Sequence, residues 1–196
     1  MADPLRNYRK RRRAGKTPEP MGGRPSGKGP IFVVQEHKAT SHHFDLRIEV
    51  DGVLKSWAVP KGPSIDPRDK RLAMPTEDHP LDYADFEGVI PERSYGAGAV
   101  IVWDRGLYDN ITEKDGQIQP MADALQAGHA LITLRGKKLR GGYALQRVAR
   151  GTDERWLLVK MKDDAADARR RPVSTEPKSV LSGRTVEAVE EEGPDA

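Results

Sequence analysis

Four polar side chains that could bind a metal ion or a phosphate alternate along one short stretch of the chain. They are His43, Asp45, Arg47 and Glu49. The residues between them are Phe44, Leu46 and Ile48, followed by Val50. In a β-strand, alternate side chains share a face and lie about 7 Å apart. Imidazole and carboxylate suit a divalent transition metal such as Mn²⁺ or Zn²⁺, and a guanidinium can bind a phosphate through two hydrogen bonds. The pattern therefore predicts a strand with one face in the core and the other able to hold a metal ion beside a phosphate.

Two further histidines flank this strand. His37 ends the preceding β-prone run, and the short turn at residues 38–42 could bring it alongside His43. His42 falls on the core-side face, which favours a structural role, although it could replace His43 as a ligand. A plainer interpretation also stays open, because a half-solvated antiparallel sheet has a polar outer face on which an Asp–Arg pair is only a surface ion pair.

A second polar cluster lies at residues 77–83. It reads Glu77-Asp78-His79-Pro80-Leu81-Asp82-Tyr83. A histidine before a proline in a loop is, taken alone, usually just a loop residue. Lys61 and Arg71 are further cations that could meet a phosphate. Residues 96–98 predict a turn, since they lack the lysine and the strand-to-helix context of a phosphate-binding loop. With no nucleophile elbow and no cysteine, covalent acyl chemistry has no support.

The elements that must position these residues are mainly β-strands. Asp51 and Gly52, between two β-prone runs, predict a hairpin with a type I′ turn. Further short runs, separated by glycine and proline, predict an antiparallel sheet that closes into a barrel or packs as a sandwich. The expected strands cover residues 31–34, 44–50, 53–59, 71–74, 99–103, 129–134, 142–149 and 155–161. One or two short helices are expected, at 120–127 before Gly128 and more weakly at 163–170.

Composition limits the fold to one modest core, because only 36% of residues are hydrophobic and 32% are charged. No run of 18 apolar residues predicts a membrane span, and no apolar stretch follows the charged N-terminus as in a secretory signal. We therefore expect a cytoplasmic, nucleoid-associated protein. The absence of cysteine excludes disulfides and thiolate ligands, so any metal must be held by nitrogen and oxygen atoms.

Charge divides the chain into three parts. Seven cations with no acid among them lie near the N-terminus: Arg6, Arg9, Lys10, Arg11, Arg12, Arg13 and Lys16. Such an arm commonly meets a phosphate backbone, and a solvated, disordered tail is an equally open interpretation. We expect a basic, Gly/Pro-rich arm at residues 1–30, a β-domain at 31–162 and a polar, acidic C-terminal tail at 163–196.

Four segments stand in the same order as in a known family. They are His37 with His43 to Arg47, Gly52 to Pro63, Glu77 to Tyr83, and Tyr95 to Gly98 followed by Val100 to Asp104. Over roughly residues 31–160, the chain resembles the 3′-phosphoesterase domain of bacterial DNA ligase D, the end-joining ligase, and its stand-alone relatives.

The resemblance implies a small closed antiparallel β-barrel and a metal-dependent enzyme that heals DNA 3′ ends. Such an enzyme removes 3′-terminal ribonucleotides as a phosphodiesterase and 3′-phosphates as a phosphomonoesterase, which leaves a 3′-OH for repair. The implied cofactor is Mn²⁺, with Co²⁺ or Zn²⁺ as alternatives, and the implied ligands are His37, His43 and Asp45. Arg47 and His79 resemble a phosphate-binding pair, and Tyr83 a tyrosine that supports the site. The matched secondary substrate-binding positions are Gln35, Lys61, Arg71 and Glu77.

The resemblance also implies binding partners, and the sequence departs from the family pattern at two places. We expect a monomer that acts on DNA or primer-template 3′ ends, with Ku and a DNA ligase or polymerase working in trans and no membrane. Ser41 stands where many members carry an arginine. The run Arg11 to Arg13 replaces an Arg-Asp pair, which leaves the aspartate role unfilled and weakens any role for Arg12.

Two other functions remain open. A non-catalytic module could bind DNA ends through the basic arm and the Arg47 face and recruit repair partners. A cupin-like metal oxygenase would also use two histidines and one carboxylate, in that case for non-haem iron. The nearby cations Arg47, Lys61 and Arg71 favour a phosphate over an oxo-acid substrate.

Overall fold

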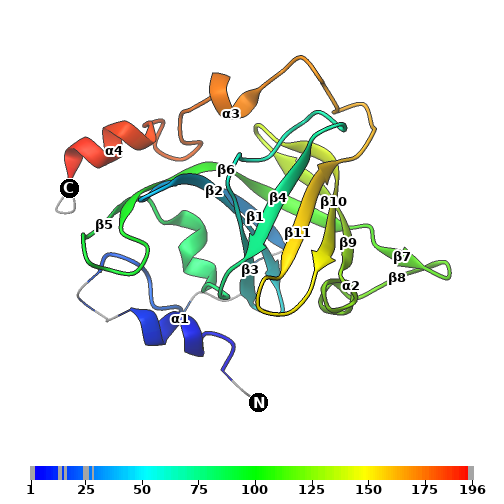
Figure 1. Cartoon of the computed structure of the whole chain (residues 1–196), viewed down its shortest axis with the longest axis horizontal. Coiled ribbons are helices and arrows are strands. Elements are labelled where there is room, and N and C mark those ends of the chain that lie inside the picture. The colour runs from blue at the N-terminus through cyan, green and yellow to red at the C-terminus, as the bar shows by residue number, and fades with distance from the viewer. Residues whose placement is uncertain (1–2, 13–14, 16, 24–26, 28, 194–196) are drawn as a thin grey trace.

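Eight antiparallel strands close into a barrel in the computed structural model, which describes residues 3–12, 15, 17–23, 27 and 29–193 (Figure 1). Neighbouring strands follow the order β1-β2-β3-β4-β11-β10-β9-β6, and β1 pairs with β6 to close the ring. The short β5 adds to β6, and β7 and β8 form a separate hairpin. The prediction of a mainly β, small closed antiparallel barrel is thus confirmed.

Most strands extend beyond the predicted runs. The strands are β1 (Ile31–Lys38), β2 (His42–Val50), β3 (Val53–Val59), β4 (Lys70–Pro75), β5 (Gly88–Ile90), β6 (Gly98–Asn110), β7 (Glu113–Lys114), β8 (Gln117–Ile118), β9 (His129–Gly136), β10 (Arg140–Ala149) and β11 (Arg155–Lys160). Strand β3 matches its predicted run, β11 ends one residue earlier, and β5, β7 and β8 were not predicted. The helices are α1 (Arg6–Arg11), α2 (Met121–Ala127), α3 (Pro172–Thr175) and α4 (Val186–Glu192), with a 3₁₀ turn η1 (Leu81–Asp85).

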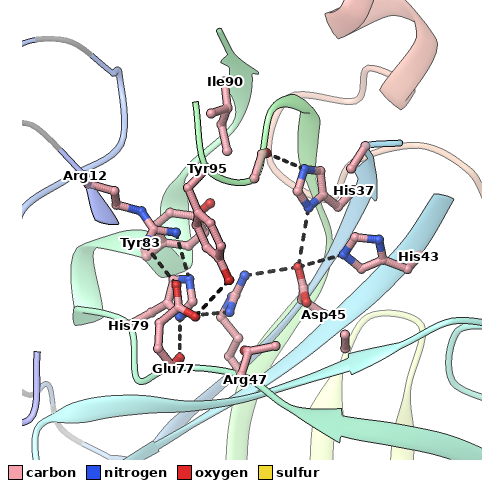
Figure 2. A pocket seen from close by; sticks show the side chains of 14 residues that line it. Arg12, His37, His43, Asp45, Arg47, Glu77, His79, Tyr83, Ile90 and Tyr95 are labelled. Carbon is pink, nitrogen blue, oxygen red and sulfur yellow. Dashed lines mark hydrogen bonds and ion pairs between the residues drawn. The ribbon is translucent and has the colours of Figure 1, made fainter. Parts of the chain in front are cut away.

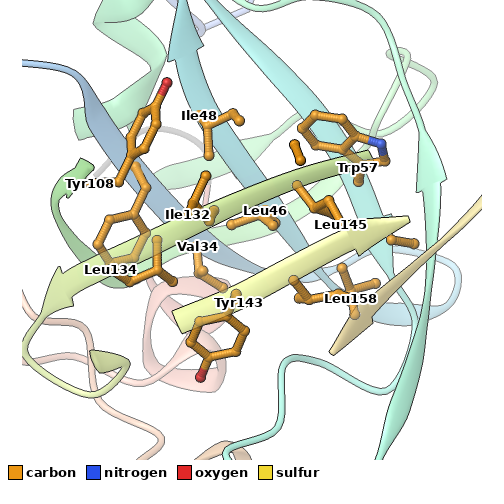
Figure 3. Packing of buried hydrophobic residues seen from close by; sticks show 14 of the residues in the cluster. Val34, Leu46, Ile48, Trp57, Tyr108, Ile132, Leu134, Tyr143, Leu145 and Leu158 are labelled. Atoms are coloured by element: carbon orange, nitrogen blue, oxygen red, sulfur yellow. The ribbon is translucent and has the colours of Figure 1, made fainter. Parts of the chain in front are cut away.

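Strand β2 presents two chemically different faces, as its alternation predicts. Its polar side chains Asp45 and Arg47 line a pocket (Figure 2). Leu46 and Ile48 point into the main core and meet residues from β3, β9, β10 and β11 (Figure 3). The turn that follows has positive φ at both central positions, 50° at Asp51 and 81° at Gly52, as a type I′ turn requires.

One of the two predicted helices is present, and the prediction of the other is wrong. Helix α2 (Met121–Ala127) ends at Gly128, whose φ of 90° gives the left-handed cap. Residues 163–170 form turns and bends instead of a helix. The Asp163 carboxylate accepts hydrogen bonds from the backbone N–H groups of Gly142 and Ala165. This aspartate therefore competes with helical hydrogen bonding and ties its own segment to β10.

Both terminal segments lie on the barrel over much of their length (Figure 1). On the N-terminal side, Tyr8 of α1 is fully buried and its hydroxyl donates to the Pro20 carbonyl at 2.7 Å. On the C-terminal side, Val186 and Val189 of α4 are buried against β6. The residues expected to form a polar tail thus include an amphipathic helix.

Some expectations fall outside the described residues, among them those for Arg13 and Lys16 of the basic run. Among the residues that the structure describes, no helix is long and apolar enough to cross a membrane.

Candidate active site

The three residues expected to bind a metal come together at one wall of a pocket of about 270 Å³ (Figure 2). His37 and His43 face each other across the β1–β2 pair, and Asp45 follows two residues later on β2. One ligand atom from each of these residues lies within 4.8 Å of the others. Within the described ranges, this is the group of acidic and imidazole side chains arranged to hold a metal ion.

Backbone carbonyls orient both imidazoles. His37 Nε2 lies 2.9 Å from the Gly96 carbonyl, and His43 Nδ1 lies 2.9 Å from the Ser41 carbonyl. Each of these nitrogens must therefore carry the hydrogen and donate it. Outer hydrogen bonds of this kind typically hold histidine ligands ready for a metal. The other two nitrogens, His37 Nδ1 and His43 Nε2, lie 3.8 Å and 3.7 Å from Asp45 Oδ2. Burial lowers the pKa of His43, but its interaction with the charged Asp45 carboxylate outweighs burial and raises that pKa above its ordinary value.

The protonation states of His37 and Asp45 also fit a divalent metal. Burial lowers the pKa of His37 to about 4, although the Asp45 charge opposes this. Burial would raise the pKa of Asp45, but Arg47 and then His43 hold it well below its usual range. Asp45 is therefore charged and His37 neutral near pH 7. A nitrogen and oxygen donor set in these states suits Mn²⁺, Co²⁺ or Zn²⁺.

Arg47 connects this trio to a second group of residues in the pocket. Its Nη2 donates to Asp45 Oδ2 at 3.1 Å, and its Nη1 lies 3.1 Å from His79 Nδ1. Its Nε donates to Gln35 Oε1 at 2.8 Å. Its guanidinium also lies 4.9 Å from the centre of the Tyr83 ring. Arg47 is almost fully buried, so these partners fix its orientation.

His79 lies between two guanidinium groups. Arg47 approaches its Nδ1, and Arg12 Nη2 lies 3.5 Å from its Nε2. Burial is the main cause that lowers the pKa of His79 well below its ordinary value, and the charges of Arg47 and Arg12 add to it. His79 is therefore neutral near pH 7 in the protein without substrate. The Tyr83 ring packs edge-on against it, with 4.7 Å between centroids.

The four expected secondary substrate-binding residues do not all lie in this pocket. Glu77 lines the pocket and accepts hydrogen bonds from Arg11 and Arg12. Gln35 lies behind Arg47, where its amide nitrogen donates to the carbonyls of Tyr83 and Phe86. Lys61 and Arg71 are not in this pocket. Both line a separate cavity of about 140 Å³, together with Arg170 and Arg171.

Sequence reasoning gave no secure role to Arg12, which the structure places in the pocket. Its Nε donates to Glu19 at 2.7 Å and its Nη1 to Glu77 at 3.0 Å. The guanidinium also lies 3.8 Å from the centre of the Tyr8 ring. The only available signal was the basic run itself, and nothing in that run distinguishes Arg12 from its neighbours.

His42 lies apart from the trio. Its imidazole is about half exposed, and its Nε2 lies 2.7 Å from Glu36. The described fold and pocket thus define a class of protein: a small β-barrel with a candidate three-ligand metal site in its wall and buried arginines beside it.

Comparisons with known proteins show which family this is. Residues 35–147 match the family described as the DNA ligase D 3′-phosphoesterase domain. The multifunctional non-homologous end joining protein LigD of Pseudomonas aeruginosa is 47% identical over 189 residues, which is 93% of this chain and 22% of that protein. LigD of Mycobacterium tuberculosis is 47% identical over 165 residues, or 83% of this chain and 20% of the relative. In Mycolicibacterium smegmatis, LigD is 43% identical over 166 residues, again 83% of this chain and 21% of the relative.

The chain belongs to the DNA ligase D 3′-phosphoesterase domain family. It spans about a fifth of the length of these curated relatives. Membership in a family described as a 3′-phosphoesterase domain implies a hydrolase of phosphate esters.

Proposed function

We propose that the protein is a metal-dependent phosphoesterase that heals DNA 3′ ends. It removes 3′-terminal ribonucleotides and 3′-phosphates and leaves a 3′-OH. The observation that carries this proposal is that a His-His-Asp donor set and two buried arginines share one pocket. The family's phosphoesterase description supports the reaction class.

In this proposal His37, His43 and Asp45 hold Mn²⁺, with Co²⁺ or Zn²⁺ as alternatives. When bound, such a metal ion withdraws charge from a phosphate oxygen and lowers the pKa of a water molecule towards neutrality. The protein contributes the preset orientation of the three donors, since carbonyls of Gly96 and Ser41 fix both imidazoles before any ligand arrives.

Arg47 and Arg12 bind the phosphate oxygens that face away from the donor set. Both guanidinium groups are buried and held by carboxylate or amide partners, so they need little reorganisation as charge develops on the phosphate. An anion bound between them would counter the two positive charges that, together with burial, keep His79 neutral. His79 could then take up a proton and deliver it to the leaving oxygen. Tyr83 and Gln35 support Arg47 and His79 from behind.

The substrates and partners follow from the same family. We propose DNA or primer-template 3′ ends that carry a ribonucleotide or a phosphate, with Ku and a ligase or polymerase as partners in trans. The relatives' names place them in non-homologous end joining. Lys61 and Arg71 lie in a separate cavity, and we assign them to backbone phosphates farther from the reacting end. We propose a monomer that works in the cytoplasm on the nucleoid.

The decisive experiment is a 3′-end digestion whose products are resolved by length and by terminal phosphate. With Mn²⁺, the protein should convert a primer ending in one ribonucleotide, and a primer ending in a 3′-phosphate, to a 3′-OH product. EDTA should stop both reactions, and added Mn²⁺ should restore them. If the protein binds these ends and leaves them intact, it is the non-catalytic end-binding module.

Two neighbouring histidines provide a matched pair of variants. His43→Ala removes one donor and should lower kcat at least about 100-fold, the scale of one lost electrostatic contact in a catalytic site. His42→Ala removes an exposed imidazole outside the donor set and should keep near-normal kcat. Equal activity of the two variants would contradict the assignment of the metal site.

A further inference from the structure

Tyr95 is an exposed aromatic side chain at the candidate active site. Of the large apolar side chains that are exposed in the described residues, it is the one that lines the pocket. Almost half of the residue, 47%, is accessible to solvent. In Figure 2 its ring reaches over the pocket between the metal-binding trio and the Arg12–His79 group. The proposed function assigns no role to this ring.

Several contacts hold the Tyr95 ring in place despite its exposure. Its hydroxyl accepts a hydrogen bond from Arg11 Nη1 at 2.6 Å and donates to Glu77 Oε2 at 3.3 Å. The guanidinium of Arg11 lies 4.6 Å from the ring centre, and that of Arg12 lies 5.5 Å away. A fixed aromatic ring next to arginines is the arrangement with which proteins stack nucleobases.

The position of Tyr95 in the chain ties it to the metal site. The next residue, Gly96, is the one whose carbonyl accepts from His37. Gly96 has a φ of 76°, and a Cβ there would lie 3.9 Å from the His37 ring. One turn therefore supplies both the hydrogen bond that orients a metal-binding imidazole and the exposed ring. A phosphate held by the trio would thus have its neighbouring nucleoside beside Tyr95.

We propose that Tyr95 is the stacking platform for a nucleobase adjacent to the phosphate that the pocket holds. This inference rests on the proposed function. The stacked base can belong to either of two nucleotides. It belongs either to the terminal nucleoside, which leaves when the diester is cut, or to the penultimate nucleotide, which stays on the strand. Only the second is present in a primer that ends in a 3′-phosphate.

Two substitutions separate stacking from the hydroxyl contacts. Tyr95→Leu removes the ring, whereas Tyr95→Phe keeps it and removes the hydrogen bonds to Arg11 and Glu77. For a primer ending in one ribonucleotide, the leucine variant should raise KM about ten-fold or more with little change in kcat, as expected for one lost base–aromatic stack. The phenylalanine variant should stay within about two-fold of the natural protein. A phenylalanine variant as defective as the leucine variant would overturn the proposal.

Substrates without a base identify the partner of the ring. Primers are compared that carry an abasic site at the terminal or the penultimate position. If Tyr95 stacks the terminal base, Tyr95→Leu should have no effect on the terminally abasic primer or on the 3′-phosphate primer. If it stacks the penultimate base, the effect should vanish only on the penultimately abasic primer. An effect that persists undiminished on both abasic primers excludes stacking on either base.

Two measurements keep this test independent of turnover and of folding. Thermal melting and calorimetric Mn²⁺ titration should match between Tyr95→Leu and Tyr95→Phe, because Gly96 holds His37 through its backbone. Affinities of the same oligonucleotides, measured by fluorescence anisotropy without metal, should show the same dependence on the ring and the base. Absence of hydrolysis by the natural protein refutes the proposed function alone, whereas base-independent affinity refutes the stacking platform.

Discussion

Arg47 is the residue through which the two halves of the pocket make contact. It donates to Asp45 on one side and lies against His79 on the other. Gln35 fixes the third nitrogen of its guanidinium, so the side chain presents a rigid fork and not a mobile charge. Arginine and lysine differ in this respect, because lysine carries a point charge on a flexible stem.

We predict that Arg47→Lys loses most of the activity while keeping the fold. Lysine retains the positive charge near Asp45 but cannot bond Gln35, Asp45 and a phosphate oxygen together. The kcat for removal of a 3′-phosphate should fall about 100-fold or more. Urea unfolding of the variant checks that the barrel remains intact. Activity within a factor of three of the natural protein would show that Arg47 is not a phosphate contact.

The residues of the site differ in how well the sequence predicts them. Strand periodicity places Asp45 and Arg47 on one face, because side-chain direction in a strand depends only on local spacing. Arg12 and Glu77 are 65 positions apart, and their contact depends on how the N-terminal segment folds back. No local pattern encodes that path. Family resemblance was needed for His37 and His79, since they come from other elements.

At the scale of elements, the fold of the described N-terminal segment limits how the contribution of the basic arm to DNA affinity can be tested. Removing residues 1–16 would be a simple way to separate DNA affinity from catalysis if this segment were only a basic arm. The structure places Tyr8 and Arg12 in contact with His79, so this deletion would also dismantle the pocket. The exposed Arg6 and Lys10 of the same segment are the better positions at which to vary charge alone.

One buried lysine helps to hold the C-terminal segment on the barrel. Lys138, in the β9–β10 turn, donates to the carbonyls of Glu176 and Lys178 at 2.7 Å and 2.6 Å. Its ammonium also lies 4.4 Å from the centre of the Trp103 ring. Burial lowers the pKa of Lys138 to about 8, although Asp104 and Glu176 oppose this.

This pKa predicts a pH dependence of stability. Between about pH 8 and 10 the folded protein loses the Lys138 proton while the unfolded chain keeps it, so the unfolded state binds more protons and stability rises with pH. Relative to Lys138→Met, the natural protein should gain up to about 3 kcal/mol across this range. Urea unfolding at several pH values measures the difference, and Lys137→Met controls for the loss of one charge from the same turn. A difference that does not change with pH would contradict the prediction.

The prediction of secondary structure failed at two places in the C-terminal part of the chain. Residues 163–170 are rich in alanine and charge, which favours a helix, but the Asp163 carboxylate binds backbone N–H groups of its own segment and of β10. Helix α4, in contrast, was not predicted, because in this acidic stretch only Val186 and Val189 are buried against the barrel. Two valines in seven residues give a weak periodic signal.

At the scale of the whole molecule, the barrel closes at Gly106. This residue of β6 pairs with Phe32 of β1 and also with Gly136 of β9. A Cβ at Gly106 would lie 2.1 Å from the Arg135 carbonyl oxygen, so the two strands approach too closely for any side chain. The sequence predicts the strands, but it does not show which pair of strands closes the ring, since pairing partners can be far apart along the chain.

We predict that Gly106→Ala destabilises the entire barrel. The added methyl group must push β6 from β9 at the closure, which should cost about 3 kcal/mol or more. For a chain of this length the melting temperature should fall by about 10 °C. Gly27→Ala is the matched control, because nothing lies within 4 Å of a Cβ there. Equal melting temperatures would show that the strands can part at no cost.

The charges that line the pocket have a consequence for the order of binding. Arg12 and Arg47 are matched there by Asp45 and Glu77, His37 and His79 are neutral near pH 7, and His43 has a raised pKa because Asp45 outweighs its burial. A phosphate dianion therefore gains attraction when a divalent cation occupies the donor set, and the cation gains in turn from the dianion. The two ligands are thermodynamically linked, so each must strengthen the affinity of the other by the same factor. Because the charges of the divalent cation and the dianion cancel, binding both together leaves the net charge of the pocket unchanged.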